Sequence, residues 1–348
     1  MSYFNYLNLS PSKADLINSL GTTLDNLMTT DLNMTGRATI FYKECRKNSN
    51  APLSTSIASK VISGLEQNNS LLFVTGCAVR PEIDLSIGEP DGPVGAAAIA
   101  RSAYLSSGTL SVVVTANPLV RQVAATFKAA GAVVLENDAP FPPQTKQTDV
   151  FLVKIIGLDF DRNIERELLD ALNNVHPGAV IAVEHLGLAT DGRGYFSSGR
   201  PFEHGALQTT ALFKAAKDEG IPCVTCFDNP NEVGTASLHS ETTKHPPIST
   251  DFEFLLPGTS ANWAASALAA AISALAVCPH GAFTENLDVK STEAALQNGA
   301  IDPFSGLADA STGNDTIEYP YHSNIVGLMA RAASGYISAV GYLSDHHP

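Results

Sequence analysis

Short hydrophobic runs recur along the chain, and most of them are apolar at every position instead of at alternate ones. Strands with this pattern are buried on both faces, as in a parallel sheet. The runs lie at 70–76, 110–117, 132–137, 149–157, 178–185, 221–227 and 251–256. Between them, amphipathic stretches predict helices at 54–67, 93–106, 118–130, 162–175, 204–219 and 260–277. The alternation predicts a three-layer α/β fold, with a mostly parallel, doubly wound sheet and helices on both faces, in one unit or two packed lobes.

The two ends of the chain differ from this alternating part. We expect residues 1–50 to form a helical N-terminal preamble, with Ala14 to Met28 amphipathic, and residues 51–348 to form the α/β domain. Residues 280–324 are rich in Gly, Asp and Asn and are predicted to be irregular, before a final helix at 325–343. In such folds ligands bind where the carboxyl ends of strands meet the starts of helices. Functional residues are therefore expected in the loops that follow the strands.

The charge balance limits the classes of partner. The chain has 21 Lys and Arg against 35 Asp and Glu, a net charge of −14, and no basic cluster that would follow a phosphate backbone. Nucleic acid is therefore not expected as a partner. The same negative field repels an anionic substrate unless a local cation or a bound metal reverses it.

Nothing in the sequence predicts export or a membrane partner. The N-terminus lacks the basic and apolar segments of a signal peptide, so a cytoplasmic location is expected. The longest apolar stretch, Trp263 to Cys278, is too short to span a bilayer and is predicted to be a buried helix. Cys223 and Cys226 form a CxxC inside a predicted strand, so we expect them to pack in the core rather than to act as a redox or zinc motif.

The first loop of interest contains two carboxylates in a glycine-rich turn. It follows the strand that ends at Thr75 and Gly76, and it reaches Glu89 and Asp91 just before a predicted helix. Carboxylate oxygens suit a divalent cation, whereas a helix start suits an anion. The alternative is that Asp91 caps the helix and Glu89 is a solvated charge.

The second loop begins with Glu184 and His185 at the end of a strand. A carboxylate in that position is oriented toward the crevice of the sheet, where burial tunes it for acid or base catalysis. His185 is a second candidate for proton transfer, with a structural role as its alternative.

The third and fourth loops are also polar. The third has Asp228, Asn231 and Glu232 within five positions, an oxygen-rich cluster that suits Mg²⁺ or Mn²⁺. In the fourth, Ser260 or Asn262 can cap the following helix, or its first N–H groups can bind a carboxylate.

Taken in order, these loops resemble the D-glutamate cyclase-like C-terminal domain family. The first resembles the family's T-G…E-x-D-G-P-x-G-A block through Thr75, Gly76, Glu89, Asp91, Gly92, Pro93, Gly95 and Ala96. The second resembles its E-R-x-G-R-x-x-D-G-x-Y block through Glu184, Gly187, Asp191 and Gly192. The third resembles D-G-G-N-E-x-G through Asp228, Asn231, Glu232 and Gly234, and the fourth resembles S-N-W through Asn262 and Trp263. Weaker similarity continues at 299–302 and around His322.

The resemblance implies a carbon–oxygen lyase (hydro-lyase) of amino acid metabolism. It would cyclise D-glutamate, or a related amino diacid, to a 5-oxoproline-type lactam with loss of water. The attacking amine must be neutral, so a carboxylate base is needed, and we expect Glu184 or Glu232, with His185 sharing the proton role.

The resemblance also suggests how the substrate is held and polarised. A divalent cation, Mn²⁺ or Mg²⁺, would polarise the attacked carboxylate, and no nucleotide cofactor is expected. Its expected ligands are Glu89, Asp91, Asp228 and Glu232. The small carboxylate-bearing substrate is expected to contact Thr75, Gly76, Gly92, Asp191, Arg193, Asn231 and Asn262.

Other interpretations stay open. The same pocket suits a metal-dependent hydrolase of a small cyclic or phosphorylated metabolite, or a non-catalytic metabolite-binding protein. His185, Leu188 and Ser198 stand where members of the family commonly carry arginines, which leaves the identity of the diacid open. A homo-oligomer is also open.

Overall fold

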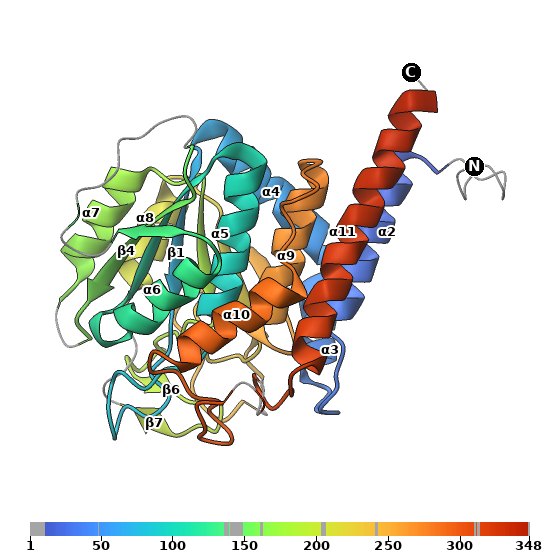
Figure 1. Cartoon of the computed structure of the whole chain (residues 1–348). Helices are drawn as coiled ribbons and strands as arrows, with labels where there is room; N and C mark the ends of the chain where they lie inside the picture. The colour runs from blue at the N-terminus through green and yellow to red at the C-terminus, as the bar shows by residue number, and fades with distance from the viewer. Residues whose placement is uncertain are drawn as a thin grey trace.

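The seven predicted strands form one parallel sheet within the part of the chain that the structure describes. This computed structural model describes residues 11–47, 49–135, 139, 149–160, 163–202, 207–240, 243–309, 311 and 314–346, the last three by backbone alone. The strands are β1 (Ser70–Thr75), β2 (Leu110–Ala116), β3 (Val133–Leu135), β4 (Leu152–Leu158), β5 (Ala179–Val183), β8 (Cys223–Phe227) and β9 (Phe254–Pro257). Their order is β3-β4-β2-β1-β5-β8-β9. The α/β prediction is confirmed (Figure 1).

The order of the sheet reverses between β1 and β5. From β1 the chain moves outward to β2 and then to the edge strand β3, returns to β4 between β3 and β2, and later continues from β5 outward to β8 and β9. Thr75 at the end of β1 is in register with Val183 at the end of β5. The loops that follow these two strands diverge at this point, which is where doubly wound folds bind ligands.

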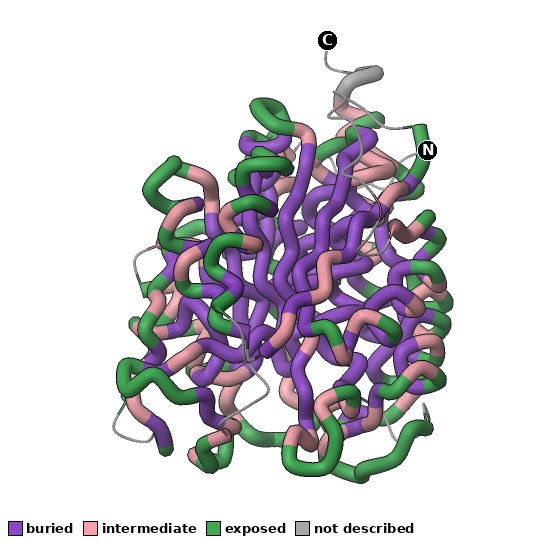
Figure 2. Tube along the Cα trace, turned by 90° about the vertical axis from the view of Figure 1, so that its left-hand side faces the viewer, coloured by how far each residue is buried: buried purple, intermediate pink, exposed green. Residues whose placement is uncertain are grey.

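Helices cover both faces of the sheet, as the apolar strands require. One face carries α5 (Pro93–Ser107), α6 (Val120–Ala129) and α9 (Ala261–Leu275), and the other carries α7 (Glu165–Val175) and α8 (Thr210–Asp218) (Figure 1). Further elements are α4 (Leu53–Gln67), the short helices η1 (Asn117–Leu119) and η2 (Ala236–Leu238), and a small hairpin of β6 (Gly194–Tyr195) and β7 (Pro201–Phe202). Buried residues run through the central strands of the sheet and the inner sides of these helices, whereas the edge strand β3 has none (Figure 2).

The N-terminal helices pack on the α/β part. Helix α2 (Lys13–Met28) lies beside α11 (Tyr321–His346), both contact α9, and α3 (Arg37–Arg46) contacts β9 (Figure 1). The Met28 and Thr30 carbonyls accept hydrogen bonds from the backbone N–H and the hydroxyl of Thr259, at 2.9 and 3.0 Å. The segment between α2 and α3 therefore joins the loop that precedes α9.

The apolar stretch at 263–278 is largely the buried helix α9, as predicted. Its small residues permit close packing on α5, because a Cβ on Gly95 would lie 2.6 Å from the Ala265 Cβ. Among the described helices, none combines the length and apolar character that crossing a bilayer requires.

The prediction that 280–324 is irregular is wrong in one part, because α10 (Glu285–Leu296) lies there. Thr284 caps this helix by accepting from the Leu287 N–H at 3.4 Å. Its buried side is mostly polar or small, with Asp288, Ser291, Thr292, Ala295 and Leu296. A helix that buries polar residues has no hydrophobic periodicity for sequence reading to detect.

Candidate active site

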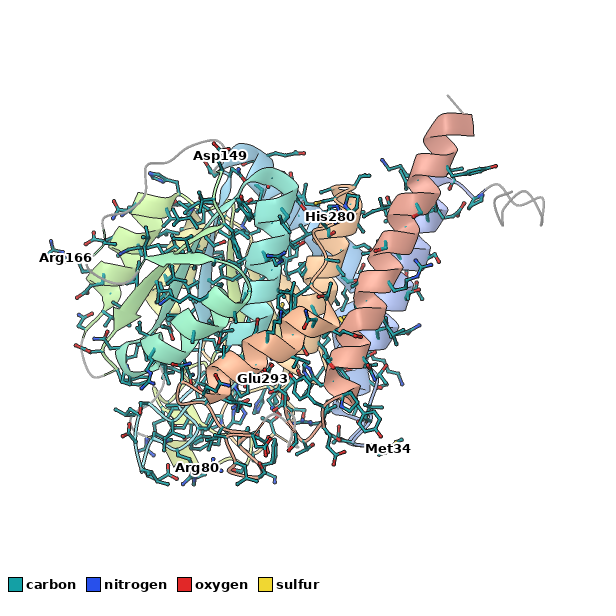
Figure 3. All side chains as sticks on the ribbon, viewed as in Figure 1. Met34, Arg80, Asp149, Arg166, His280 and Glu293 are labelled. Atoms are coloured by element: carbon teal, nitrogen blue, oxygen red, sulfur yellow. The ribbon has the colours of Figure 1, made fainter. Side chains whose placement is uncertain are left out.

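Polar loops gather at the carboxyl ends of β1, β5 and β8. Figure 3 shows Arg80 and Met34 at this end of the molecule, with Asp149 and His280 at the opposite end. Glu184 directly follows β5, and Asp228 directly follows β8. Their side chains therefore start from neighbouring strands at the reversal of the sheet.

Three carboxylates from these loops form one buried cluster. Glu184, Asp228 and Glu232 each place a carboxylate oxygen within 4.8 Å of the others. Their exposed fractions are 8%, 4% and 0%. Glu184 has a φ of +44°, an unfavourable backbone conformation for a non-glycine residue that persists only where the surroundings hold it in place.

Two oxygen atoms of the cluster have no hydrogen-bond partner in the described part of the chain. One oxygen of Glu232, Oε1, accepts from the backbone N–H groups of Asp228 and Asn229 at 2.8 and 3.0 Å. The buried Oε2 atoms of Glu232 and Glu184 have no hydrogen-bond partner among the described residues. Buried acceptors of this kind are costly unless a proton, a ligand or a cation satisfies them.

Burial, followed by the charges of nearby carboxylates, raises the pKa values of all three carboxyl groups. Burial is the main cause for Glu184, followed by the charges of Glu232 and Asp228. Burial and Asp228 likewise raise the pKa of Glu232. Burial raises the pKa of Asp228 to about 7, against the opposing positive charge of Arg37. Such groups hold protons near neutral pH or give them up to a cation.

Glu89 lies beside this cluster, on the loop after β1. It is buried, and its pKa is raised by burial and then by the charges of Asp91 and Asp228, while the Cys77 thiol donates to it. The same neighbourhood and burial raise the pKa of the Cys77 thiol, which disfavours thiolate chemistry there. Glu89 therefore adds negative potential to the cluster from the side of β1.

Asp91 and Asn262 cap each other's helices. Asp91 lies just before α5, and its carboxylate accepts from the backbone N–H groups of Ala261 and Asn262 at the start of α9, at 3.1 and 2.7 Å. The Asn262 Oδ1 atom in turn accepts from the N–H groups of Gly92 and Gly95, at 3.0 and 2.7 Å. These side chains thus join two helix N-termini, and their oxygens are already hydrogen-bonded.

We expect Asp91→Ala to lower the free energy of unfolding by about 2 kcal/mol or more, because it leaves buried N–H groups without an acceptor. The measurement is chemical denaturation, with no added cation and, in parallel samples, with Mg²⁺ or Mn²⁺. Asp84→Ala, an exposed aspartate on the same loop, is the control. A loss confined to samples that contain Mg²⁺ or Mn²⁺ would indicate instead that Asp91 is a metal ligand.

Thr75 and two glycines fix the chain at the ends of β1 and β5 beside the carboxylates. The Thr75 hydroxyl donates to the Val183 carbonyl at 2.8 Å and so ties the ends of β1 and β5 together. Gly92 has a φ of +91°, and a Cβ there would lie 2.9 Å from the Glu184 Cβ. Gly76, with a φ of +96°, is similarly close to Thr115. Only glycine fits these two turns beside the carboxylates.

Other residues expected at the site have side-chain partners outside the cluster. The His185 ring interacts with the Thr209 hydroxyl at 3.1 Å, and burial lowers its pKa to about 4, so it is neutral. Asp191 and Arg193 are exposed, and Asp191 accepts from the Tyr195 hydroxyl at 2.5 Å. Asn231 is buried and donates to the Tyr195 carbonyl at 2.9 Å.

Three charged residues at the site were missed by sequence reasoning. Arg37 lies 3.5 Å from the Asp228 carboxylate. Asp315, whose pKa is raised by burial and then by Asp91 and Asp228, lies on a loop before α11. Asp302, which is buried, raises the pKa of Glu89. The weak similarity at 299–302 was the available signal for Asp302, whereas Arg37 and Asp315 follow no predicted strand.

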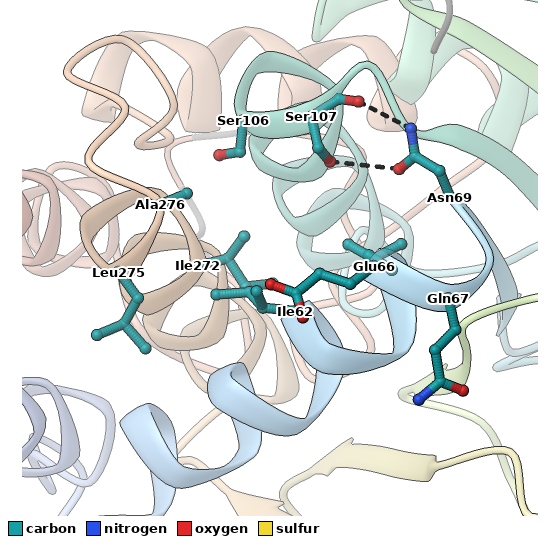
Figure 4. Close-up of a pocket in the computed structure, with 10 residues that line it drawn as sticks. Ile62, Glu66, Gln67, Asn69, Ser106, Ser107, Ile272, Leu275 and Ala276 are labelled. Carbon is teal, nitrogen blue, oxygen red and sulfur yellow. Dashed lines mark hydrogen bonds between the residues drawn. The ribbon is translucent and has the colours of Figure 1, made fainter. Parts of the chain in front are cut away.

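A separate cavity of about 600 Å³ lies at the other end of the molecule, among the C-terminal ends of α4, α5 and α9 (Figure 4). Ile62, Leu65 and Ile272 contribute its apolar lining, and Glu66 is an acidic residue at its edge. Cys223 and Cys226 are free and buried in β8, in agreement with core packing.

The fold and the site define the class of this protein. It is a doubly wound α/β protein with a buried acidic cluster at the switch point, where the strand order of the sheet reverses. A sequence model of the D-glutamate cyclase-like, C-terminal family matches residues 24–329, and the chain belongs to that family. A comparison with curated proteins found no match.

Proposed function

We propose that the protein is a lyase of the D-glutamate cyclase type. It closes D-glutamate, or a related amino diacid, to a 5-oxoproline-type lactam and releases water. The observation that carries this proposal is the buried cluster of Glu184, Asp228 and Glu232 at the switch point of the sheet. Membership of the D-glutamate cyclase-like family supports the class of reaction.

The cluster also fits a divalent cation. Asp228 and Glu232 would hold it next to Glu184, because the oxygens of all three residues are close together and one oxygen each of Glu184 and Glu232 has no partner among the described residues. Hard carboxylate oxygens match Mg²⁺ or Mn²⁺. When bound, the cation would supply positive polarisation for the carboxylate under attack.

The reaction requires protons to be transferred from the substrate amine to the leaving oxygen, and carboxyl groups can transfer them. The substrate ammonium carries three protons and the lactam nitrogen keeps one, so two protons must reach the oxygen that leaves as water. The C–N bond forms and a C–O bond breaks, with no net uptake or release of protons. A carboxyl group with a raised pKa can both accept a proton from the amine and return it to the departing oxygen.

Glu184 is the best candidate for this proton transfer. One of its oxygens has no partner within the part of the chain that the structure describes, and its pKa is raised by burial and by its acidic neighbours. One oxygen of Glu232 is held by two backbone N–H groups, which suits a fixed supporting role. Gly92, where a Cβ would lie 2.9 Å from the Glu184 Cβ, allows the loop before α5 to pass close to Glu184.

The test is a turnover screen with purified protein. D-glutamate, L-glutamate and related diacids are incubated with no cation, Mg²⁺ or Mn²⁺, and products are followed by mass spectrometry. We expect loss of one water from a D-amino diacid, with turnover that chelators remove and the cation restores. Uptake of water by a cyclic or phosphorylated substrate would indicate a hydrolase instead, and ligand binding without turnover would indicate a binding protein.

A further inference from the structure

The N-terminal segment places the positively charged side chain of Arg37 at the edge of the acidic cluster. Arg37 is the first residue of α3, and its side chain is 39% exposed, whereas its partner Asp228 is 4% exposed. Asn33, on the segment before it, donates to the Asp315 carbonyl at 3.1 Å and to the Thr316 hydroxyl at 2.6 Å. Arg37 is therefore fixed at the boundary between solvent and the buried carboxylates.

Only some of the N–H groups of the Arg37 guanidinium donate hydrogen bonds to described residues. One terminal nitrogen donates to the Asn229 Oδ1 atom and the other to the Asp228 carboxylate. The Nε atom is buried and has no partner among the described residues. An arginine has five N–H donors in a planar fork that matches a carboxylate, so the remaining donors can donate hydrogen bonds to a second anion.

The other described arginines near these loops have different surroundings. Arg80 donates to the Val79 and Pro303 carbonyls, at 2.8 and 2.6 Å. Arg200 lies 3.5 Å from Glu82 and packs over the Phe196 ring. Arg193 is exposed on its loop. Arg37 is thus the described arginine that contacts the carboxylate cluster itself.

We infer that Arg37 recognises the carboxylate of the substrate that does not react, and that the N-terminal segment thereby contributes specificity to the site. This inference rests on the proposed function. A diacid that closes to a lactam keeps one carboxylate in the product, so Arg37 binds the same group before and after the reaction. The acidic cluster would repel this group without a cation beside it.

The test compares two lactams that differ only in this carboxylate. 5-Oxo-D-proline carries it and 2-pyrrolidinone lacks it, and their dissociation constants are measured by calorimetry for wild type, Arg37→Met and Arg37→Lys. Lys43→Met, an exposed position on the same helix, is the control. We expect Arg37→Met to weaken 5-oxo-D-proline binding by about 10- to 100-fold, to leave 2-pyrrolidinone unchanged, and to raise KM for the diacid more than it lowers kcat. Arg37→Lys should recover part of the loss.

The outcomes separate this inference from the proposed reaction. Equal weakening of both lactams, or no change in either, would overturn carboxylate recognition by Arg37 even if wild type makes lactam. A wild type that makes no lactam but prefers 5-oxo-D-proline through Arg37 would overturn the reaction and support the recognition. If wild type binds neither lactam and turns over no diacid, both are overturned.

Discussion

Glu184→Gln is expected to lower kcat for lactam formation by a factor of about 10² to 10⁴ and to leave the fold intact. The range is typical for loss of a positioned acid or base. Glutamine has nearly the same shape as a protonated glutamate but cannot exchange a proton with the amine. Since burial and acidic neighbours already favour the neutral form of Glu184, the substitution does not introduce an unfavourable group.

The measurement is kcat and KM for the diacid found in the turnover screen, with the thermal midpoint Tm recorded for each variant. Glu66→Gln, on an exposed glutamate at the opposite end of the molecule, is the matched control and should retain wild-type rates. A Glu184→Gln enzyme that keeps more than about a tenth of wild-type kcat would show that the base lies elsewhere. Glu232→Gln is then the next variant to measure.

The metal-free protein is expected to lose stability as the pH rises from about 6.5 to 8, and a divalent cation should reverse this. Asp228 has a pKa of about 7 in the folded protein against an ordinary value of 3.8. The pKa values of Glu184 and Glu232 are also raised. A group with a raised pKa holds a proton in the folded state that the unfolded chain has released, so its stabilising effect is complete below the unfolded pKa and is lost as pH rises through the folded pKa.

The lower limit of this pH range, about 6.5, is set by His185, whose effect on stability has the opposite sign to that of the carboxyl groups. His185 has its pKa lowered to about 4, so it favours folding as pH rises toward 6.5 and is neutral in both states above that. Above pH 6.5 the carboxyl groups therefore dominate. One carboxyl that stays protonated across this window contributes about 2 kcal/mol, and the cluster should lower Tm by roughly 5 °C or more.

Calorimetric melting at pH 6.5 and 8.0, with chelator or with Mg²⁺ or Mn²⁺, measures the effect. A cation that binds ionised carboxylates should raise Tm more at pH 8.0 than at pH 6.5. The Glu184→Gln, Glu232→Gln double variant should show a smaller fall with pH, while Glu66→Gln should match wild type. A flat or rising Tm in chelator would argue against a protonated cluster.

A site residue could be predicted from the sequence where its position directly after a predicted strand also fixes its position in the fold. Glu184 and Asp228 directly follow apolar strands, so parallel topology alone brings them to one edge of the sheet. Asp91 also follows this logic, but its hydrogen bonds to Ala261 and Asn262 depend on how closely α5 and α9 pack. No local pattern encodes that distance.

The sequence by itself determined the architecture and the composition of the site. Continuous apolar runs require burial on both faces, so they specify a parallel sheet between helices, and acidic residues after those runs specify a polar edge. Only the tertiary structure decided which carboxylates lie together in one cluster, that Arg37 reaches them from the N-terminal segment, and that α10 buries a polar side. The physical reason is range: periodic burial acts over a few residues, whereas charge pairing and capping join atoms that are distant in the chain.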